Sequence, residues 1–236
     1  IDIKGFFDNV DHSKLLKQIW SLGIHDKNLL CVISKLLKAP IQGEGVPQKG
    51  TPQGGILSPL LSNIVLNEFD WWISNQWETF PSEFPYRWDG DRCSALKKTK
   101  LKEMYLVRYA DDFKIFCRNR KDAKRVKIAV EKWLKERLHL ETSPEKSKIT
   151  NLCRHYSEFL GFKLKLEERP KQNVIVSHMA DKSKKKVTAK LRKAIWDARG
   201  NEDRARNLNM VIRGMHNYYC AATRISNDFW EIYYLL

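Results

Sequence analysis

The sequence predicts an α+β fold, in which a sheet covered by helices is followed by a helical module. The prediction rests on the order of the hydrophobic patterns. Up to about residue 178 they follow the order strand, helix, strand, strand, helix, strand, and from Asp181 onward every pattern is helical. The length of 236 residues suits one large domain or two modest ones. We therefore expect one domain at 1–178 and a second, helical domain at 179–236.

Turn and cap residues define the expected elements of the first hundred residues. Gly23 follows a run with apolar residues on one helical face, which marks the end of a helix. The stretch before Ser58 is rich in proline and glycine and favours a loop. Ser58 and Pro59 are residue types that commonly open a helix. The expected elements are a strand at 1–3, helices at 14–22, 27–37 and 58–77, a loop at 40–55 and an exposed excursion at 79–100.

The later elements follow from spacing alone. Two apolar stretches around one polar break predict a pair of strands, and a basic stretch with apolar residues at helical spacing predicts a helix. Three shorter apolar stretches predict further strands. The expected elements are strands within 104–118, a helix at 122–138, strands at 148–152, 159–166 and 174–177, and helices from 181 onward.

The charge is strongly positive and unevenly distributed, with a net value of +15. Residues 1–96 contain 9 basic and 11 acidic side chains, whereas residues 97–236 contain 34 and 17. Such a basic half predicts a polyanionic partner, although a bias toward solubility is the simpler alternative. No apolar run approaches the roughly 18 residues of a membrane span, and no basic helix has a strong apolar face, so a membrane partner is not expected.

The five cysteines form no Cys-x-x-Cys pair, which argues against a zinc cluster and against a disulfide framework. Reduced thiols predict an intracellular, cytoplasmic protein. The chain opens on Ile1, inside an apolar stretch and without a methionine, so we expect a further region upstream.

Adjacent aspartates, Asp111 and Asp112, lie between two apolar strands. Aspartate is common in hairpin turns, which is the alternative to a functional role. However, two-residue turns prefer Asn-Gly or Asp-Gly, and neighbouring carboxylates repel unless a cation is near. Asp2 also ends an apolar stretch, and three acids on one sheet would form a hard oxygen site suited to Mg²⁺. A pair of such ions can activate a 3′-hydroxyl and stabilise a leaving pyrophosphate.

Five segments together resemble the motifs of reverse transcriptases, in the order of that family. They are the first catalytic motif at 2–8 (DIKGFFD), the nucleotide-pocket motif at 50–59 (GTPQGGILSP), the YxDD box at 109–112 (YADD), a lysine motif at 145–147 (EKS) and the FLG segment of the primer grip at 159–161. The tail resembles the thumb or X domain of group II intron-encoded proteins at Leu208-Asn209, Gly214 and Asn217-Tyr218-Tyr219.

The resemblance implies a right-hand polymerase fold. An RRM-like antiparallel palm sheet with its helices would occupy 1–178 together with part of the fingers. A helical thumb or maturase X domain, expected to be incomplete, would occupy 179–236. The rest of the fingers, with basic residues for the triphosphate, is expected to be missing.

The resemblance also implies a role for single residues. Two Mg²⁺ ions would be held by Asp2, Asp111, Asp112 and the Ile3 carbonyl, and Lys146 would donate a proton to pyrophosphate unless it is a solvated surface lysine. The nucleotide would meet Phe7, Gln53, Gly54 and Tyr109. The primer end would meet Phe159, Leu160 and Gly161.

Phe7 would exclude a 2′-hydroxyl, with a core role as the alternative. Strict alternation along a strand would instead put Phe6 beside the sugar, because Phe6 lies an even number of positions from Asp2 and would share its face of the strand. Gly5 permits a bend that resets this phase.

The basic residues of the helical module are candidates for RNA binding, with a solvated helix face as the alternative. They are Lys182, Lys184, Lys185, Lys186, Arg192 and Lys193.

The resemblance thus implies an RNA-directed DNA polymerase from a bacterial mobile intron. Its partners would be group II intron RNA, an RNA template, a DNA primer and dNTPs, and it would assist splicing as a maturase. The alternatives are an RNA-binding maturase with a vestigial polymerase site and an RNA-templated RNA polymerase, which a bulky Phe7 disfavours.

Overall fold

The computed structural model describes residues 1–40, 43, 45–51, 55–82, 84–170, 172–199 and 202–236, with backbone alone at 202–203. Its contacts divide the chain into unit 1 (Ile1–Ile149) and unit 2 (Thr150–Leu236). The division therefore lies earlier than the expected boundary at 178. The reason is that the last strand before 178 bonds to the C-terminal helices, through Ser177 to Thr223 and through Met179 to Asp228. None of the helices in these ranges has the length and apolar character that a membrane span requires.

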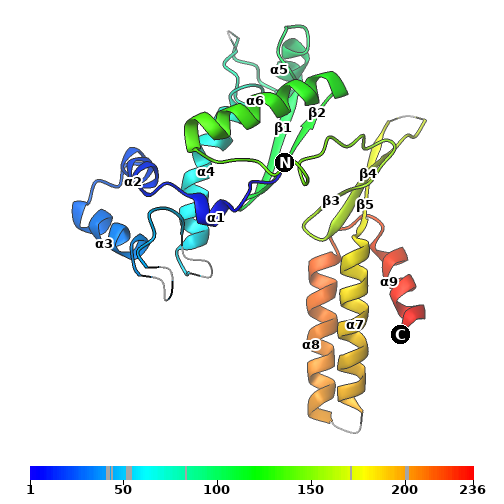
Figure 1. Ribbon diagram of the computed structural model, residues 1–236. Helices are drawn as coiled ribbons and strands as arrows, with labels where there is room; N and C mark the ends of the chain where they lie inside the picture. The colour runs from blue at the N-terminus through cyan, green and yellow to red at the C-terminus, as the bar shows by residue number, and fades with distance from the viewer. Residues whose placement is uncertain (41–42, 44, 52–54, 83, 171, 200–201) are drawn as a thin grey trace. The chain divides into compact units, whose positions relative to one another are not determined.

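Unit 1 contains six helices and one β-hairpin among its described residues (Figure 1). The expected helices are confirmed. Asp11, Asp26 and Asn119 cap three of them by accepting backbone N–H bonds. Ser58, expected as a cap, is instead the first residue of its helix, while Pro59 lies in the first turn as expected. The expected excursion at 79–100 contains a further short helix. The elements are α1 (Phe6–Asn9), α2 (His12–Ser21), α3 (Lys27–Leu37), α4 (Ser58–Ser74), α5 (Asp89–Leu96), β1 (Met104–Tyr109), β2 (Asp112–Cys117) and α6 (Arg120–Leu138).

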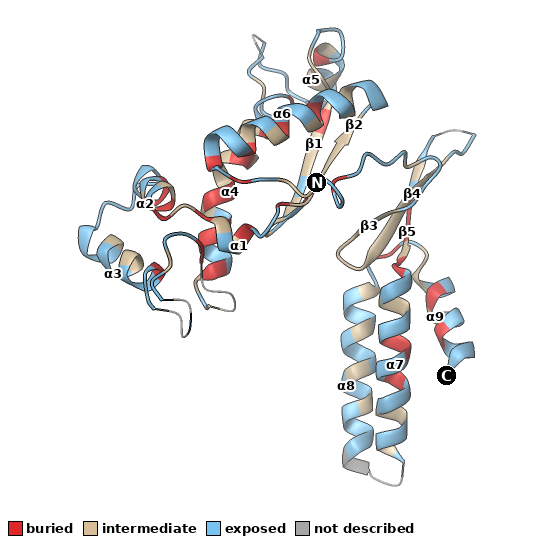
Figure 2. Cartoon of the chain, in the orientation of Figure 1, coloured by how far each residue is buried: buried red, intermediate tan, exposed pale blue. Residues whose placement is uncertain are grey.

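Helix α4 forms the centre of the unit 1 core, where Figure 2 shows buried residues along α4 and on the inner face of α6. Phe69 is fully buried and packs edge-on against Phe113 of β2, with 5.0 Å between ring centroids. On the α6 side, Trp133 lies 5.5 Å from Phe69 and stacks on Trp72. The hairpin is thereby fixed to α4, and its other face remains open.

Two expected strands are absent from the described residues, one at the start of unit 1 and one across the boundary of the two units. Residues 1–3 form a single bridge, between Ile3 and Thr142, because Gly5 follows with a φ of 53° and turns the chain into α1. Residues 148–152 do not pair as a strand because the carbonyl of Asn151 accepts N–H bonds from Arg154 and His155, which folds the segment into a turn.

Unit 2 combines a three-stranded antiparallel sheet with three helices (Figure 1). The stretch expected as one strand at 159–166 is a hairpin, because Leu160 and Gly161 both have positive φ, at 49° and 79°. Two such residues form the tight turn whose twist suits a hairpin. The elements are β3 (Ser157–Phe159), β4 (Phe162–Glu167), β5 (Val174–Met179), α7 (Asp181–Ala198), α8 (Glu202–Tyr219) and α9 (Ile225–Leu235).

Candidate active site

Asp2 is held in place by the backbone of a distant segment. Its carbonyl accepts an N–H bond from Ser143 at 2.8 Å, and its own N–H donates to the buried Ser147 hydroxyl at 3.1 Å. The bridge from Ile3 to Thr142 continues this pairing. The Asp2 carboxylate is therefore presented from a braced backbone, although the expected strand is absent.

A cleft of about 290 Å³ opens beside Asp2 in unit 1. The ammonium of Lys146 lies 3.5 Å from Oδ2 of Asp2, so the expected lysine and the first aspartate meet. Asp111 reaches the same cleft from the β1–β2 turn. The lining residues are Asp2, Ile3, Lys4, Gly5, Phe6, Phe7, Asp111, Ser143 and Lys146.

The second and third aspartates lie at the tip of the hairpin. Tyr109 pairs with Asp112 across the strands, so Ala110 and Asp111 form the two-residue turn. Ala110 has a φ of 53°, a conformation that a residue with a side chain rarely adopts. Tyr109 and Asp112 share the open face of the hairpin and are exposed, whereas Asp111 is half-buried.

Asp2 and Asp112 both influence the pKa of the Ile1 amino group, which links the third aspartate to the first. Burial, and next the charge of Lys114, lower the pKa of the Ile1 amino group, while Asp2 and Asp112 act in the opposite direction. Both carboxylates therefore lie within electrostatic range of the same amino group.

The donor atoms at the cleft fit Mg²⁺ in their chemistry. Carboxylate oxygens from Asp2 and Asp111 and the hydroxyl of Ser143 are the hard ligands that Mg²⁺ prefers. The complete expected ligand set is not assembled. Asp112 lies outside the cleft lining, and within the described ranges no three Asp, Glu, His or Cys side chains are close enough to hold a metal ion.

Phe6 and Phe7 occupy different environments, which bears on the expected sugar contact. Both belong to α1, so the strand alternation that favoured Phe6 does not operate. Both residues line the cleft, but Phe6 is 2% exposed and belongs to the core, whereas Phe7 is only partly buried and packs against that core. Of the two rings, Phe7 is the one with surface available to a ligand.

The first two residues of the expected nucleotide-pocket motif are hydrogen-bonded to the backbone of α1 and of the residue that follows it. Thr51 N–H donates to the Phe7 carbonyl at 2.6 Å, and Gly50 N–H donates to the Val10 carbonyl at 2.7 Å. Gly50 has a φ of 95°, and a Cβ there would lie 3.0 Å from the carbonyl oxygens of Phe7 and Asp8, so glycine is required. Phe7 and this motif therefore form one structural feature, whereas Gln53 and Gly54 lie outside the described residues.

Sequence reasoning missed His12, which stabilises the same contact. Its ring is 6% exposed, and Nε2 donates to the Gly50 carbonyl at 2.6 Å. A histidine without a spaced partner carries no signal of such a bond, because the acceptor is a backbone atom of a distant loop.

The expected primer-grip residues form the β3–β4 hairpin of unit 2. Tyr218 donates its hydroxyl proton to the Leu160 carbonyl at 3.0 Å, and Ala180 N–H donates to Gly161 at 2.8 Å. A Cβ on Gly161 would meet the Ser183 hydroxyl at 3.0 Å. The turn is thus held against the start of α7 and the end of α8, so the FLG segment and Tyr218 are in direct contact.

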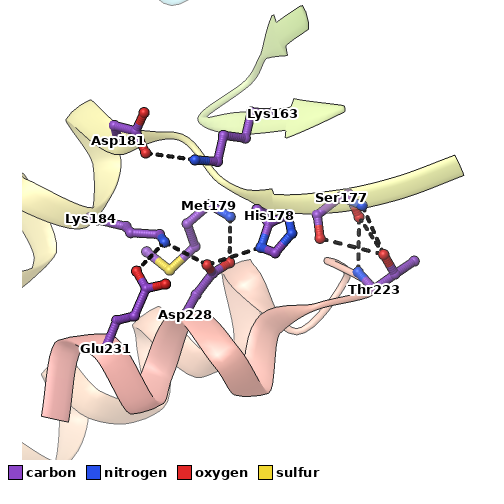
Figure 3. Close-up of polar contacts among 9 residues, drawn as sticks. All are labelled: Lys163, Ser177, His178, Met179, Asp181, Lys184, Thr223, Asp228 and Glu231. Carbon is purple, nitrogen blue, oxygen red and sulfur yellow. Dashed lines mark hydrogen bonds and ion pairs between the residues drawn. The ribbon is translucent and has the colours of Figure 1, made fainter. Parts of the chain in front are cut away.

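The candidate RNA-binding residues separate into two groups. Lys182, Lys185, Lys186 and Lys193 are exposed on α7. Lys184 instead turns into unit 2, where its ammonium lies 2.7 Å from the fully buried Asp228 and 2.6 Å from Glu231 (Figure 3).

The ion pairs of Lys184 argue against the RNA contact that the sequence predicts for it. Burial would lower the pKa of Lys184, but the hydrogen bonds to Asp228 and Glu231 outweigh it and raise the pKa. Asp228 also accepts bonds from Met179 N–H and His178 Nδ1, at 2.7 and 3.1 Å. Lys184 is thus part of the internal charge network of unit 2. Arg192, although exposed, donates to the Leu235 carbonyl and ties α7 to α9.

Replacing Lys184 by alanine should destabilise the protein strongly. The change removes the ammonium group from the buried Asp228 carboxylate, which keeps only its bonds from His178 and from Met179 N–H. Loss of one member of a buried ion pair costs about 3–5 kcal/mol. The free energy of unfolding, measured by chemical denaturation, should fall by that amount. Lys185→Ala, one position along on the exposed face, is the matched control and should unfold like wild type. Equal stability of the two variants would contradict the assignment of Lys184.

A family model described as reverse transcriptase (RNA-dependent DNA polymerase) matches residues 1–164, which include all the residues that line the cleft. The chain belongs to the reverse transcriptase family. This match covers all of unit 1 and, in unit 2, strand β3 and the first half of β4. The small antiparallel sheets with their helices are compatible with such a domain.

Intron-encoded proteins are prominent among the relatives of this reverse transcriptase. The group II intron-encoded protein LtrA of Lactococcus lactis subsp. cremoris is 32% identical over 206 residues, which cover 70% of this chain and 34% of LtrA. The putative COX1/OXI3 intron 1 protein of Saccharomyces cerevisiae is 28% identical over 70% of this chain and 24% of its own length. Protein YkfC of Escherichia coli K12 is 27% identical over 84% of this chain and 55% of its own length. The chain spans about a third of the length of LtrA.

Proposed function

We propose that this chain carries the polymerase site of a group II intron reverse transcriptase, which copies an RNA template by adding dNTPs to a primer 3′-hydroxyl. The observation that supports this most strongly is the cleft that the expected site residues share. Asp2, Phe7, Asp111 and Lys146 line it although they come from three separate parts of the chain. Family membership supports the reaction class, and the cleft supports the assignment of residues.

Each residue of the cleft has a task in this proposal. Asp2, Asp111 and Asp112 supply the carboxylates for two Mg²⁺ ions, with the Ile3 carbonyl as a further ligand. When bound, Mg²⁺ supplies positive charge to the attacking 3′-hydroxyl and the leaving pyrophosphate. Lys146, whose side chain is 72% exposed, is free to move from Asp2 to the pyrophosphate and donate a proton there.

The other substrate contacts complete the proposed palm and thumb. Phe7 lies against the sugar of the incoming nucleotide, and Tyr109, exposed beside Asp112, contacts the nucleotide or template. The Phe159–Gly161 turn holds the primer end. Gln53 and Gly54 belong to the nucleotide pocket in this proposal by their place in the motif alone.

The polymerase proposal is tested by primer extension on an RNA template with dNTPs, using the complete gene product that carries these residues. We expect elongated DNA that requires both the RNA template and Mg²⁺. The alternative function, splicing assistance with a vestigial polymerase site, predicts intron RNA binding and splicing without any extension product.

We further propose that unit 2 binds the intron RNA through the exposed lysines of α7, as part of a maturase function. Lys182, Lys185, Lys186 and Lys193 lie on the solvent side of a helix whose other face packs in the core through Val187 and Leu191. Exposed ammonium groups can release counterions from phosphates without any loss of internal contacts.

Binding of the intron RNA should depend steeply on salt. If each of the four lysines neutralises one phosphate, at roughly −0.7 to −0.9 per contact, the log–log slope is about −3 to −4. Replacing Lys182, Lys185 and Lys186 together by alanine should make the slope shallower by about two to three, because each contact contributes nearly one. Filter binding or fluorescence anisotropy over a salt series measures this. A wild-type slope shallower than about −2, or one that the triple variant leaves unchanged, would make these lysines a solvated helix face.

A further inference from the structure

Arg108 of β1 makes a dense set of bonds directly beneath the aspartate turn. Its Nε and Nη2 donate to the two carboxylate oxygens of Asp70 at 2.7 and 2.5 Å, and Nη1 donates to Asn63 at 2.9 Å. The same Nη1 donates to the carbonyl of Ala110 at 2.7 Å. The Arg108 side chain is only 12% exposed. One guanidinium therefore connects α4 to the tip of the hairpin.

The anchor on α4 is rigid. Asn63 and Asp70 are seven positions apart, so they lie on one face of the helix, two turns from each other. Between them Leu66 and Phe69 are completely buried in the unit 1 core. The two-point contact of a planar guanidinium with a carboxylate also fixes its orientation, which a flexible ammonium group could not do.

The carbonyl that accepts this bond from Arg108, that of Ala110, influences the orientation of Asp111. The Ala110 carbonyl belongs to the peptide that joins Ala110 to Asp111, so its direction sets the plane from which the Asp111 side chain starts. Ala110 has a φ of 53°, a strained conformation for alanine that persists only where surrounding contacts impose it. The bond from Arg108 is such a contact.

We propose that Arg108 is a positioning residue that, with Asp70 and Asn63, holds the Ala110–Asp111 peptide so that Asp111 faces the metal site. The simpler alternative is an ion pair that only ties β1 to α4. The proposal rests on the polymerase function above, because it assigns Asp111 a ligand role. It also accounts for an arginine next to Tyr109 on a strand face that otherwise buries apolar side chains such as Phe113.

The test uses Arg108→Gln, Arg108→Lys and a matched control in the complete protein. The control is Arg137→Gln, because Arg137 of α6 also pairs with α4, through Glu68 at 3.1 Å, and is remote from the turn in its contacts. Mn²⁺ binding, measured by electron paramagnetic resonance without nucleic acid, reports on the site directly. The Mg²⁺ dependence of primer extension and the melting temperature complete the set.

We expect both Arg108 variants to bind Mn²⁺ at least 10-fold more weakly and to need at least 10-fold more Mg²⁺ for half-maximal extension. Arg137→Gln should match wild type in both. Arg108→Lys is decisive, because lysine can keep the ion pair with Asp70 but cannot also reach the Ala110 carbonyl in the same geometry. A merely structural role predicts that lysine restores metal binding and extension along with the melting temperature, and that result would overturn the proposal.

Failure of the polymerase assignment gives a different pattern. If Asp111→Asn leaves Mn²⁺ binding and primer extension unchanged, Asp111 is no ligand, and the positioning role falls with the function. If Asp111→Asn abolishes both while Arg108→Gln leaves both at the wild-type level, the function stands and the positioning role is overturned.

Discussion

Asp111→Asn should abolish DNA synthesis while leaving RNA affinity within about twofold of wild type. The amide removes one negative charge from the carboxylates that face the cleft, and the loss of a shared ligand is expected to weaken both metal positions. RNA affinity is carried in this account by the exposed lysines of unit 2. Single-nucleotide incorporation and RNA binding by anisotropy, measured on the same preparation, separate the two effects.

A second aspartate provides the control for this change. Asp89, at the start of α5, is 93% exposed and pairs only with the neighbouring Arg92 among its recorded ion pairs. Asp89→Asn should therefore polymerise like wild type. Extension by Asp111→Asn at a hundredth of the wild-type rate or better would argue against its role as a metal ligand.

Phe7→Ala should increase ribonucleotide incorporation far more than it decreases the use of deoxynucleotides. An aromatic ring packed against the core cannot move to admit an additional oxygen without strain. Discrimination of about 10³-fold or more corresponds to at least ~4 kcal/mol of differential transition-state energy, at 1.36 kcal/mol per factor of ten. A steric clash can reach that magnitude, whereas one lost dispersion contact cannot. The measurement is the ratio of kcat/KM for an NTP and its matching dNTP.

Phe6→Ala is the matched control for the sugar contact. Phe6 is 2% exposed, so its removal should cost about 3–5 kcal/mol of stability without changing the ratio of ribonucleotide to deoxynucleotide use. If Phe7→Ala lowers the melting temperature in the same way and leaves the ratio unchanged, Phe7 is a core residue only.

Local signals account for the parts of the fold that the sequence predicts well. The helices α2, α3 and α6 begin beside aspartate or asparagine caps, and their apolar residues repeat at helical spacing. The β1–β2 hairpin is likewise local, because its two strands are separated by the Ala110–Asp111 turn alone. Contacts within a few residues were sufficient for these elements.

Long-range contacts explain what the sequence could not predict. The chain near Asp2 pairs with 142–143, so its apolar pattern alone could not show that it forms a bridge and no strand. Leu160 adopts a positive φ that leucine rarely takes, so the turn within the FLG segment had Gly161 as its only local sign. Lys184 lies in a run of lysines, and only its contact with Asp228 distinguishes it from its neighbours.

In the candidate site, too, local motifs could be predicted from the sequence and long-range contacts could not. The motifs predicted that Asp2, Phe7, Asp111 and Lys146 belong together, and the structure places all four on one cleft. The motifs did not indicate which residues support them. The bonds from Asp2 N–H to the Ser147 hydroxyl and from His12 to the Gly50 carbonyl run between segments far apart in sequence.

In the proposed polymerase site Asp2 and Asp111 act as one catalytic unit, and a double-mutant comparison decides whether they do. The single-turnover rate of dNTP addition on an RNA template should be measured for Asp2→Asn, Asp111→Asn and the double variant. Residues that act as a unit show strongly non-additive losses. We predict that each single variant loses at least 100-fold and that the double variant is no slower than about threefold below the worse single one. Retention of a tenth or more of the wild-type rate by Asp2→Asn, or losses that multiply in the double variant, would contradict the account.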